Sequence, residues 1–141
     1  MRSSDAEFIG PLAEHAFGEY SARAARTTLA LARGPRASTF VVCAGALRVG
    51  FAVVEFQNDR EAHLAAIAVA EGYRGSGIGR CLLSHAEREV AARKRVLLRL
   101  VTSQANLAAI DLFLKSGFKI ESRLPRYYAR GQDALLMVKR L

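Results

Sequence analysis

The sequence predicts an α+β fold in which a mixed, mainly antiparallel central sheet is flanked by helices. Three observations lead to this prediction. The first part of the chain has the apolar spacing of helices, the next reads as three strands joined by short turns, and the rest alternates helices with strands. Strands joined by tight turns pair antiparallel. With 141 residues, 51% of them hydrophobic, we expect a single domain spanning residues 1–141.

The expected elements follow the order helices, β-β-β-α-β-α-β-β. They are a helical segment at 5–33, strands at 39–43, 49–56 and 63–69, a helix at 77–93, a strand at 96–101, a helix at 105–116, and strands at 118–122 and 134–138. We expect Gly10-Pro11 and Gly18 to interrupt the first segment and Gly34-Pro35 to stop it, while Ala44-Gly45 suits a hairpin turn.

Composition excludes several classes of protein. Cys43 and Cys81 are far apart in apolar surroundings, so we expect two buried free thiols, and the three scattered histidines predict no metal site. No long apolar run and no signal-peptide core is present, which predicts a cytoplasmic protein without a membrane partner. The net charge of +8 attracts anions, but the arginines form no stripe along the sequence, so we do not expect nucleic acid as a partner.

A glycine-rich loop, Arg74-Gly75-Ser76-Gly77-Ile78-Gly79, lies between the third strand and an amphipathic helix. Its glycines allow a tight turn with exposed backbone N–H groups, and the helix N-terminus adds free donors and a positive dipole end. Arg74 and Arg80 add full positive charge. The loop therefore predicts a diphosphate site that needs no metal.

There are three other interpretations of this loop. Its glycines would also suit a simple flexible connection. A dinucleotide-binding loop is disfavoured because the spacing is not G-x-G-x-x-G and no βαβ unit opens the chain. A kinase-type phosphate loop is excluded because no Gly-Lys-Ser/Thr follows.

The residues Ile67-Ala68-Val69 and the loop after them resemble the acetyl-coenzyme A motif of the GNAT superfamily of N-acetyltransferases, whose core is Gln/Arg-x-x-Gly-x-Gly/Ala. A second match, Asn106-x-x-Ala109-x-x-x-Phe113-x-x-x-Gly117-Phe118, is similar to the family's second cofactor-contacting helix. The closest branch acetylates protein N-termini and includes the ribosomal-protein-alanine acetyltransferases. Arg126-Tyr127-Tyr128 is similar to a tyrosine pair in the substrate loop of that branch.

This resemblance implies a GNAT-like fold and acetyl-coenzyme A as cosubstrate. The pantetheine arm would pair with the third strand as an extra strand, and one backbone N–H there would stabilise the developing oxyanion. Asn106 and the helix bearing Phe113 would line the other side of the cleft. The cofactor contacts implied in this way are Ile67, Ala68, Val69, Arg74, Gly75, Ser76, Gly77, Ile78, Gly79, Arg80, Asn106 and Phe113.

The chain departs from this branch at two catalytic positions. By the resemblance, a glutamate base is replaced by Val101 and a tyrosine acid by Phe113, and neither replacement moves a proton. His63 is the remaining candidate base, because a pKa of about 6.5 suits neutral pH and other members carry a glutamate there. Tyr128 is the candidate donor to the departing thiolate, with Tyr127 beside it. A solvated strand-end histidine and simple ring packing are the alternatives.

Three functions stay open at this stage. The first is acetyl transfer to an amine, which is a peptide or protein N-terminal α-amine or a small molecule. The second is a coenzyme-A-binding regulator that has lost catalysis, a hypothesis suggested by Val101 and Phe113 at the two catalytic positions. Nucleic-acid binding is the third and least favoured. A homodimer is compatible with the sequence.

Overall fold

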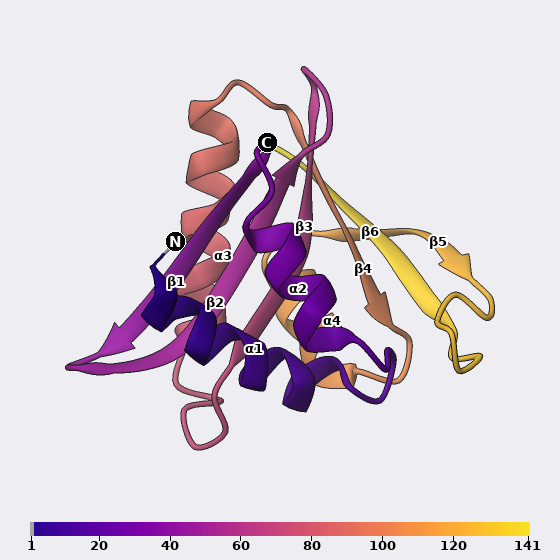
Figure 1. Cartoon of the computed structure of the whole chain (residues 1–141). Helices are drawn as coiled ribbons and strands as arrows, with labels where there is room; N and C mark the ends of the chain where they lie inside the picture. Colours follow the sequence, from indigo (N-terminus) through magenta and orange to yellow (C-terminus); the bar gives the residue numbers. More distant parts are fainter. Residues whose placement is uncertain (1) are drawn as a thin grey trace.

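The computed structural model describes residues 2–141, which form four helices and one six-stranded sheet (Figure 1). In chain order the elements are α1 (Ser3–Phe17), α2 (Ala24–Ala32), β1 (Ala37–Ala44), β2 (Leu47–Phe56), β3 (Glu61–Val69), α3 (Ile78–Ala92), β4 (Leu97–Ser103), α4 (Leu107–Lys115), β5 (Lys119–Leu124) and β6 (Ala134–Arg140). The strand order is β1-β2-β3-β4-β6-β5, and only β3 and β4 pair in parallel. The predicted fold class is confirmed.

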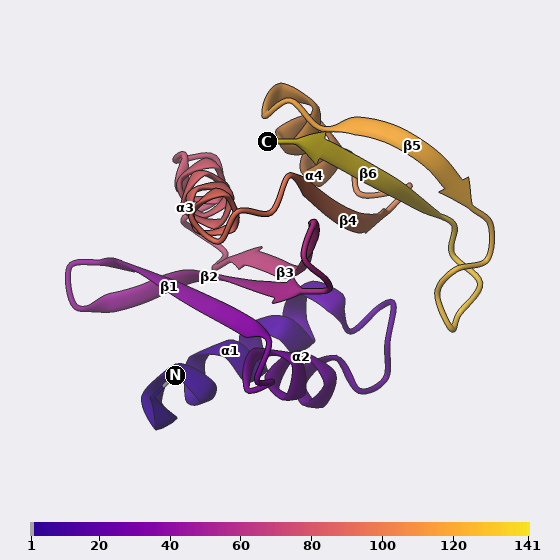
Figure 2. The same ribbon diagram turned by 90° about the horizontal axis from the view of Figure 1, so that it is seen from above.

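The helices form two layers around the sheet (Figure 2). α1 and α2 cover β1 to β3 on one face, where Ile9, Phe51 and Val53 are fully buried. α3 and α4 cover the other face, where Leu83, Leu98 and other apolar side chains form a larger core. The two faces follow from strand alternation, because successive side chains of a strand point to opposite sides.

β3 and β4 pair over three residues and then separate. Their register joins Glu61 to Leu97, Ala62 to Leu98 and His63 to Arg99, and no pair follows. Figure 2 shows the two strands diverging, with β4, β6 and β5 turning away from β1 to β3. The edge of β3 beyond His63 therefore has no strand partner on the β4 side, and its backbone groups there are free for another extended chain.

A β-bulge at Ala65 changes which face the end of β3 presents. Val54 of β2 pairs with Leu64, whereas Val53 pairs with Ala66, so Ala65 is the extra residue. Leu64 belongs to the core under α3 and α4, while Ala66 belongs to the core under α1 and α2. The bulge thus turns Ile67, next along the strand, towards the α3 and α4 face.

One predicted helix break is wrong and the other is correct. α1 continues through Pro11 to Phe17, so Gly10-Pro11 does not interrupt it. A Cβ atom at Gly10 would lie 3.4 Å from the Leu29 side chain, an ordinary contact distance, so α1 packs directly on α2 at this point. Gly18 is the C-cap of α1, as predicted. No helix of residues 2–141 has both the length and the hydropathy needed to cross a membrane.

The prediction of two buried thiols is wrong. Cys43 and Cys81 are both free, and both are exposed. Their apolar neighbours in the sequence lie on other faces of the same elements. Beside Cys81, for example, Leu82 and Leu83 point into the core while the thiol points outward from α3.

Candidate functional site

The glycine loop enters α3 with its backbone in left-handed conformations. Gly72, Gly75 and Gly77 have φ values of 91°, 79° and 87°, and Gly77 is the N-cap of α3. No atom lies within 4 Å of a Cβ built on any of these three glycines. The first turn of α3 contains no acidic side chain that would compete for its free N–H groups. The arrangement suits an anion at the start of the helix.

Side chains of the loop hold its own backbone. The Arg74 guanidinium donates from Nε to the Val69 carbonyl at 3.2 Å, and the Ser76 hydroxyl donates to the Tyr73 carbonyl. Arg74, Ser76 and Arg80 are exposed. Arg74 precedes the start of α3 by four residues and Arg80 lies in its first turn, so both add positive charge to this region, which favours a diphosphate.

Apolar side chains form the floor between β3 and the helices. Ile67, Val69, Ile78 and Leu112 are partly buried and pack against the core under α3 and α4. A Cβ at Gly79 would lie 3.2 Å from Leu112, so the first turn of α3 contacts α4 closely. Both helices thus pack against the end of β3 on this face.

α4 carries the second predicted set of cofactor residues. Asn106 is exposed and caps the helix, its Oδ1 accepting a hydrogen bond of 3.2 Å from the Ala109 N–H. Phe113 is only 3% exposed, and its ring centroid lies 5.7 Å from that of Phe118. Phe113 therefore supports α4 from inside the core, while Asn106 lies on the surface.

His63 lies where β3 and β4 begin to separate. Its register partners are Glu55 on β2 and Arg99 on β4. Burial lowers the pKa of His63; Glu55 opposes this effect and Arg99 adds to it. Arg99 is itself held by Glu61 at 3.3 Å and Glu121 at 2.7 Å. The imidazole is consequently neutral near pH 7, the state in which a base acts.

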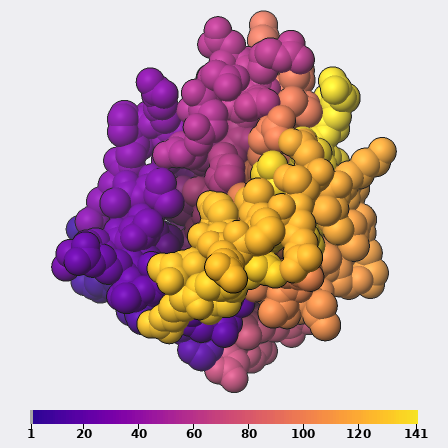
Figure 3. All heavy atoms as spheres, turned by 90° about the vertical axis from the view of Figure 1, so that its right-hand side faces the viewer, coloured from indigo at the N-terminus to yellow at the C-terminus, as the bar shows by residue number. Residues whose placement is uncertain are grey.

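Two loops from opposite ends of the chain meet beside the end of β4. The rings of Tyr20, after α1, and Tyr128, between β5 and β6, have centroids 4.8 Å apart, and Tyr127 lies 5.1 Å from Tyr128. In Figure 3 the yellow-orange C-terminal segments lie against the indigo N-terminal ones. Burial raises the pKa of Tyr128 to about 12, helped by the two neighbouring tyrosines.

The raised pKa of Tyr128 limits its role. A phenol with a pKa of about 12 is a weaker acid than a thiol, whose ordinary pKa is about 8.5, so full proton transfer to a thiolate is uphill. A hydrogen bond from the neutral hydroxyl to a thiolate carries no such cost. Tyr128 is therefore suited to donate a hydrogen bond rather than a proton.

Five residues of this junction were missed from the sequence. The Gln132 amide donates to the Glu19 carbonyl at 2.9 Å, and the Arg130 guanidinium donates to the same carbonyl at 3.4 Å. Burial raises the pKa of Tyr20, whose hydroxyl interacts with Ser103 and with Glu19. Glu19 and Gln132 are 113 residues apart, so no local pattern signals the contact.

Val101 lies on the face of β4 that this junction covers. Its place two residues after Arg99 and two before Ser103 puts all three on one side of the strand. Val101 is partly buried. An apolar side chain therefore stands between His63, at the point of strand separation, and the Tyr20–Tyr128 junction.

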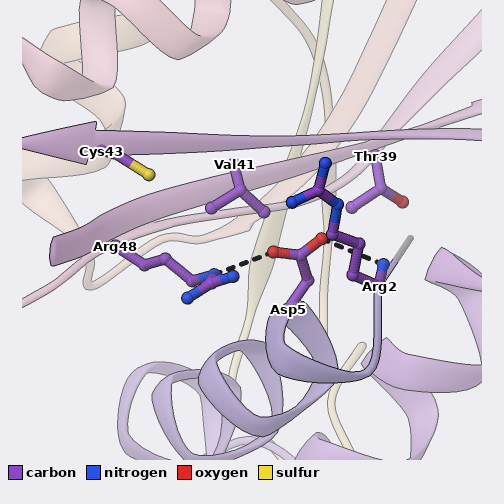
Figure 4. Close-up of a pocket in the computed structure, with 6 residues that line it drawn as sticks. All are labelled: Arg2, Asp5, Thr39, Val41, Cys43 and Arg48. Atoms are coloured by element: carbon purple, nitrogen blue, oxygen red, sulfur yellow. Dashed lines mark hydrogen bonds and ion pairs between the residues drawn. The ribbon is translucent and has the colours of Figure 1, made fainter. Parts of the chain in front are cut away.

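Two hollows of the surface lie elsewhere. One, of about 290 Å³, is lined by Arg2, Asp5, Thr39, Val41, Cys43 and Arg48 beside β1 and the start of α1 (Figure 4). Its carboxylate is already bound, because Asp5 accepts from Arg48 at 2.9 Å and from the Arg2 N–H at 3.0 Å, which lowers the pKa of Asp5. A second hollow lies between α1 and α2. Among the described residues, no group of three or more potential metal ligands occurs.

Comparison with known sequences gives one family. Residues 6–118 match the model of the Acetyltransferase (GNAT) family. The N-alpha-acetyltransferase of Sulfurisphaera tokodaii is 43% identical over 81 residues, covering 55% of this chain and 47% of that relative. The [Ribosomal protein bS18]-alanine N-acetyltransferase of Escherichia coli (strain K12) is 33% identical over 113 residues, covering 78% and 76%. The chain spans about half the length of the first curated relatives it matches.

Solved structures agree with this match. Ard1 from Thermoplasma volcanium has a TM-score of 0.90 at 27% identity, with 100% of this chain and 94% of that one covered. The ribosomal-protein-S18-alanine N-acetyltransferase from Escherichia coli has a TM-score of 0.84 at 29% identity, with 99% and 90% covered. An aminoglycoside 6'-N-acetyltransferase solved with coenzyme A shares the fold, with a TM-score of 0.82 at 20% identity over 99% and 92% of the chains.

Proposed function

Because the chain belongs to the GNAT family of acetyltransferases, we propose that it transfers the acetyl group of acetyl-coenzyme A to the α-amine at a peptide or protein N-terminus. One observation carries the proposal. The unpaired edge of β3 leads directly into the glycine loop at the N-terminus of α3. An extended, amide-containing arm that ends in a diphosphate fits this combination.

The residues of the cleft fit the acetyl donor in three respects. No strand pairs with Ile67 to Val69 on the β4 side, so the pantetheine amides can pair with the backbone there, with Arg74 giving up the Val69 carbonyl where the two compete. The open space at Gly75 and Gly77 lets phosphate oxygens approach the N–H groups of the helix start. Arg74 and Arg80 supply the balancing charge.

His63 is placed to act as the base. A strand rises about 3.3 Å per residue, so the four residues from His63 to Ile67 span about 13 Å along β3. The diphosphate end of the donor lies beyond Val69, which leaves the thioester end nearer to His63 and the separation of the strands. The lowered pKa of His63 keeps the imidazole unprotonated at neutral pH.

The chemistry is direct attack on the thioester. The neutral amine nitrogen bonds to the acetyl carbon while the carbon–sulfur bond breaks, the amine proton passes to His63 directly or through water, and the thiolate leaves and is protonated by solvent. A backbone N–H of β3 stabilises the carbonyl oxygen as it gains charge. Tyr128 donates a hydrogen bond to the departing sulfur.

The acceptor class follows from proton affinity. Deprotonating a lysine amine with a pKa of about 10.4 costs roughly 4.6 kcal/mol at pH 7, against about 1 kcal/mol for an α-amine near 7.8. Val101 supplies no carboxylate to offset the larger cost. The relatives named as N-alpha-acetyltransferase and [Ribosomal protein bS18]-alanine N-acetyltransferase support the same class of acceptor.

A comparison of matched acceptors tests this function. Acetyl-coenzyme A would be incubated with a peptide bearing a free N-terminus and no lysine, a blocked peptide with one internal lysine, and spermidine as a small amine, with thiol release and product mass as readouts. We expect kcat/KM for the free N-terminus to exceed that of the other two by at least about tenfold. Preference for lysine or spermidine would overturn the acceptor assignment, and coenzyme A binding without turnover of any amine would support the regulator alternative.

A further inference from the structure

Four segments that are far apart in the sequence meet at the end of the sheet opposite the glycine loop (Figure 1). Backbone hydrogen bonds of 2.8 Å join them: the Phe56 N–H donates to Arg36, Val96 to Arg60, and Leu141 to Val96. β1, β3 and β4 begin here, and β2, β6, α2 and α3 end here. The residues of these segments are thus neighbours in space.

The side chains that these segments expose are mainly cationic. We call this surface the basic end, and its cations are Arg33, Arg36, Arg60, Arg93, Lys94, Arg95 and Arg140. Arg93 is paired with Glu89 at 2.9 Å, and no salt bridge within residues 2–141 engages the other six. Asp59 is the acidic residue of the turn between β2 and β3. Glu55, Glu61 and Glu89 also lie on elements that end or begin here, and against the seven cations the surface keeps a net positive charge.

Part of the basic end is rigid. The guanidinium groups of Arg93 and Arg95 lie 4.3 Å and 5.2 Å from the centre of the Phe56 ring. Arg95 also donates to the Asn58 carbonyl at 2.9 Å, and Arg93 donates to the Ser38 hydroxyl at 3.0 Å. Two of the cations are consequently held in place, so they lose little conformational freedom when an anion binds.

We propose that the basic end is a nucleic-acid-binding surface that contacts the phosphate backbone without reading sequence. Six of its seven cations are arginines, whose planar forks match phosphate. Protein interfaces have apolar or aromatic centres, whereas nucleic-acid interfaces are more polar and strongly positive. Of the large exposed hydrophobic residues, only Leu141 lies at this end. The sequence spreads these arginines over more than a hundred positions, and the fold gathers them.

The basic end is separate from the acetyl-donor cleft. The glycine loop follows the end of β3 and precedes α3, while the basic end lies at the start of β3 and the end of α3. α3 has 15 residues and so spans about 22 Å. Occupation of one surface leaves the other accessible, and nucleic-acid binding does not depend on the proposed acetyl transfer.

The test measures binding of a fluorescein-labelled 20-nucleotide oligouridine by anisotropy at several salt concentrations. Arg36→Gln/Arg60→Gln/Arg140→Gln removes three cations of the basic end. Arg23→Gln/Arg26→Gln/Arg126→Gln removes three exposed cations at the start of α2 and in the loop between β5 and β6, as a control of equal net charge. We expect the wild type to bind with a Kd of about 10⁻⁴ to 10⁻⁶ M at physiological salt, and the slope of log K against log salt to fall by about 2 in the first variant.

The expected outcome at 50 mM salt is a loss of affinity of about tenfold or more in the basic-end variant and of less than threefold in the control variant. Saturating coenzyme A should leave binding unchanged. Equal losses of affinity in the two variants would show that binding depends on net charge alone, and would overturn the proposal. Competition by coenzyme A would place the oligonucleotide on the glycine loop, and equally tight binding of poly-glutamate would indicate an acidic protein partner; either result also overturns it.

Discussion

The side-chain amide of Gln132 donates a hydrogen bond to the backbone carbonyl of Glu19, and this bond joins the loop between β5 and β6 to the loop between α1 and α2. The two residues are 113 positions apart. Tyr20 and Tyr128 stack beside the bond, so both walls of the proposed acceptor site depend on one junction. We propose that the junction lines the site of the peptide acceptor, with Tyr128 at its boundary with the acetyl donor.

Gln132→Glu should weaken acceptor binding selectively. The carboxylate keeps the shape of the side chain but has no N–H to donate, and it faces a carbonyl oxygen. Loss of one hydrogen bond costs about 1 kcal/mol, so the KM for a peptide acceptor should rise about five- to tenfold, with the Kd for coenzyme A unchanged by calorimetry. Gln104→Glu, which adds the same charge at an exposed position after β4, serves as the control. An equal rise of KM in both variants would contradict a role for the junction.

The fold and the glycine loop at the start of α3 were predictable from the sequence because their signals are local. Runs of β-branched and aromatic residues separated by turns predict β1 and β2, and the glycines before Ile78 mark a turn into a helix. Each of these inferences needs fewer than twenty consecutive residues. The helix at 77–93 and the hairpin at Ala44-Gly45 are confirmed within one or two residues.

The acceptor side was not accessible because its contacts are long-range. The junction of Glu19 with Gln132, and the approach of Tyr20 to Ser103, form only when the two ends of the chain meet. The prediction of a break at Gly10 was wrong for the same reason. The local sequence suggests a break, whereas in the fold this residue packs against Leu29 of a second helix.

Gly77→Glu should abolish binding of the acetyl donor. The new carboxylate would lie at the N-cap of α3 and repel the diphosphate, a like-charge contact that costs several kcal/mol. We expect the Kd for coenzyme A, measured by calorimetry, to rise at least about 100-fold. Binding of wild-type strength would remove the diphosphate from this loop.

A matched glycine separates this effect from backbone strain. Gly45 in the β1–β2 hairpin also has a positive φ, 61°, and no atom within 4 Å of a built Cβ. Gly45→Glu and Gly77→Glu should therefore each lower the free energy of unfolding by about 1 to 2 kcal/mol. In Gly45→Glu the Kd for coenzyme A should stay at the wild-type value. If the two variants lose affinity in parallel, general destabilisation explains both.

Tyr128 should keep its proton far above the ordinary range. Burial raises its pKa to about 12, so spectrophotometric titration should show one tyrosine ionising near that value. This ionisation should be absent from the titration of Tyr128→Phe. The unfolded chain releases this proton near pH 10. Between about pH 10 and 12 the folded state therefore binds more protons, and the free energy of unfolding should fall as pH rises.

The same variant measures the catalytic role of the hydroxyl. Tyr128→Phe keeps the ring contact with Tyr20, and loss of a hydrogen bond to a charged sulfur costs about 1.5 to 3 kcal/mol. We expect kcat to fall about 10- to 100-fold with little change in the KM for peptide. Tyr127→Phe, whose side chain is exposed, is the control. Unchanged kcat in Tyr128→Phe would leave the ring with a packing role alone.

His63 should set the acid limb of the pH dependence. Its pKa lies below the ordinary 6.5 because the imidazole is buried, so the base is already neutral at pH 7. On acidification, activity should therefore be lost only below pH 6.5. The rate should rise again near pH 7.8, where the α-amine of the peptide loses its proton. His63→Ala should lower kcat for an N-terminal peptide by about 10- to 1000-fold and remove the lower limb.

A stability measurement tests the same group without catalysis. Below pH 6.5 the unfolded chain binds a proton at this histidine that the folded state resists, so the free energy of unfolding should fall as pH drops from 6.5 through the folded pKa. Glu55 opposes this loss and Arg99 adds to it, since they are the charged register partners of His63. His63→Gln should flatten the dependence in urea denaturation at pH 5 to 7, whereas His85→Gln, at an exposed position of α3, should not. Wild-type activity in His63→Ala would exclude this residue as the base, even if the stability profile changes as expected.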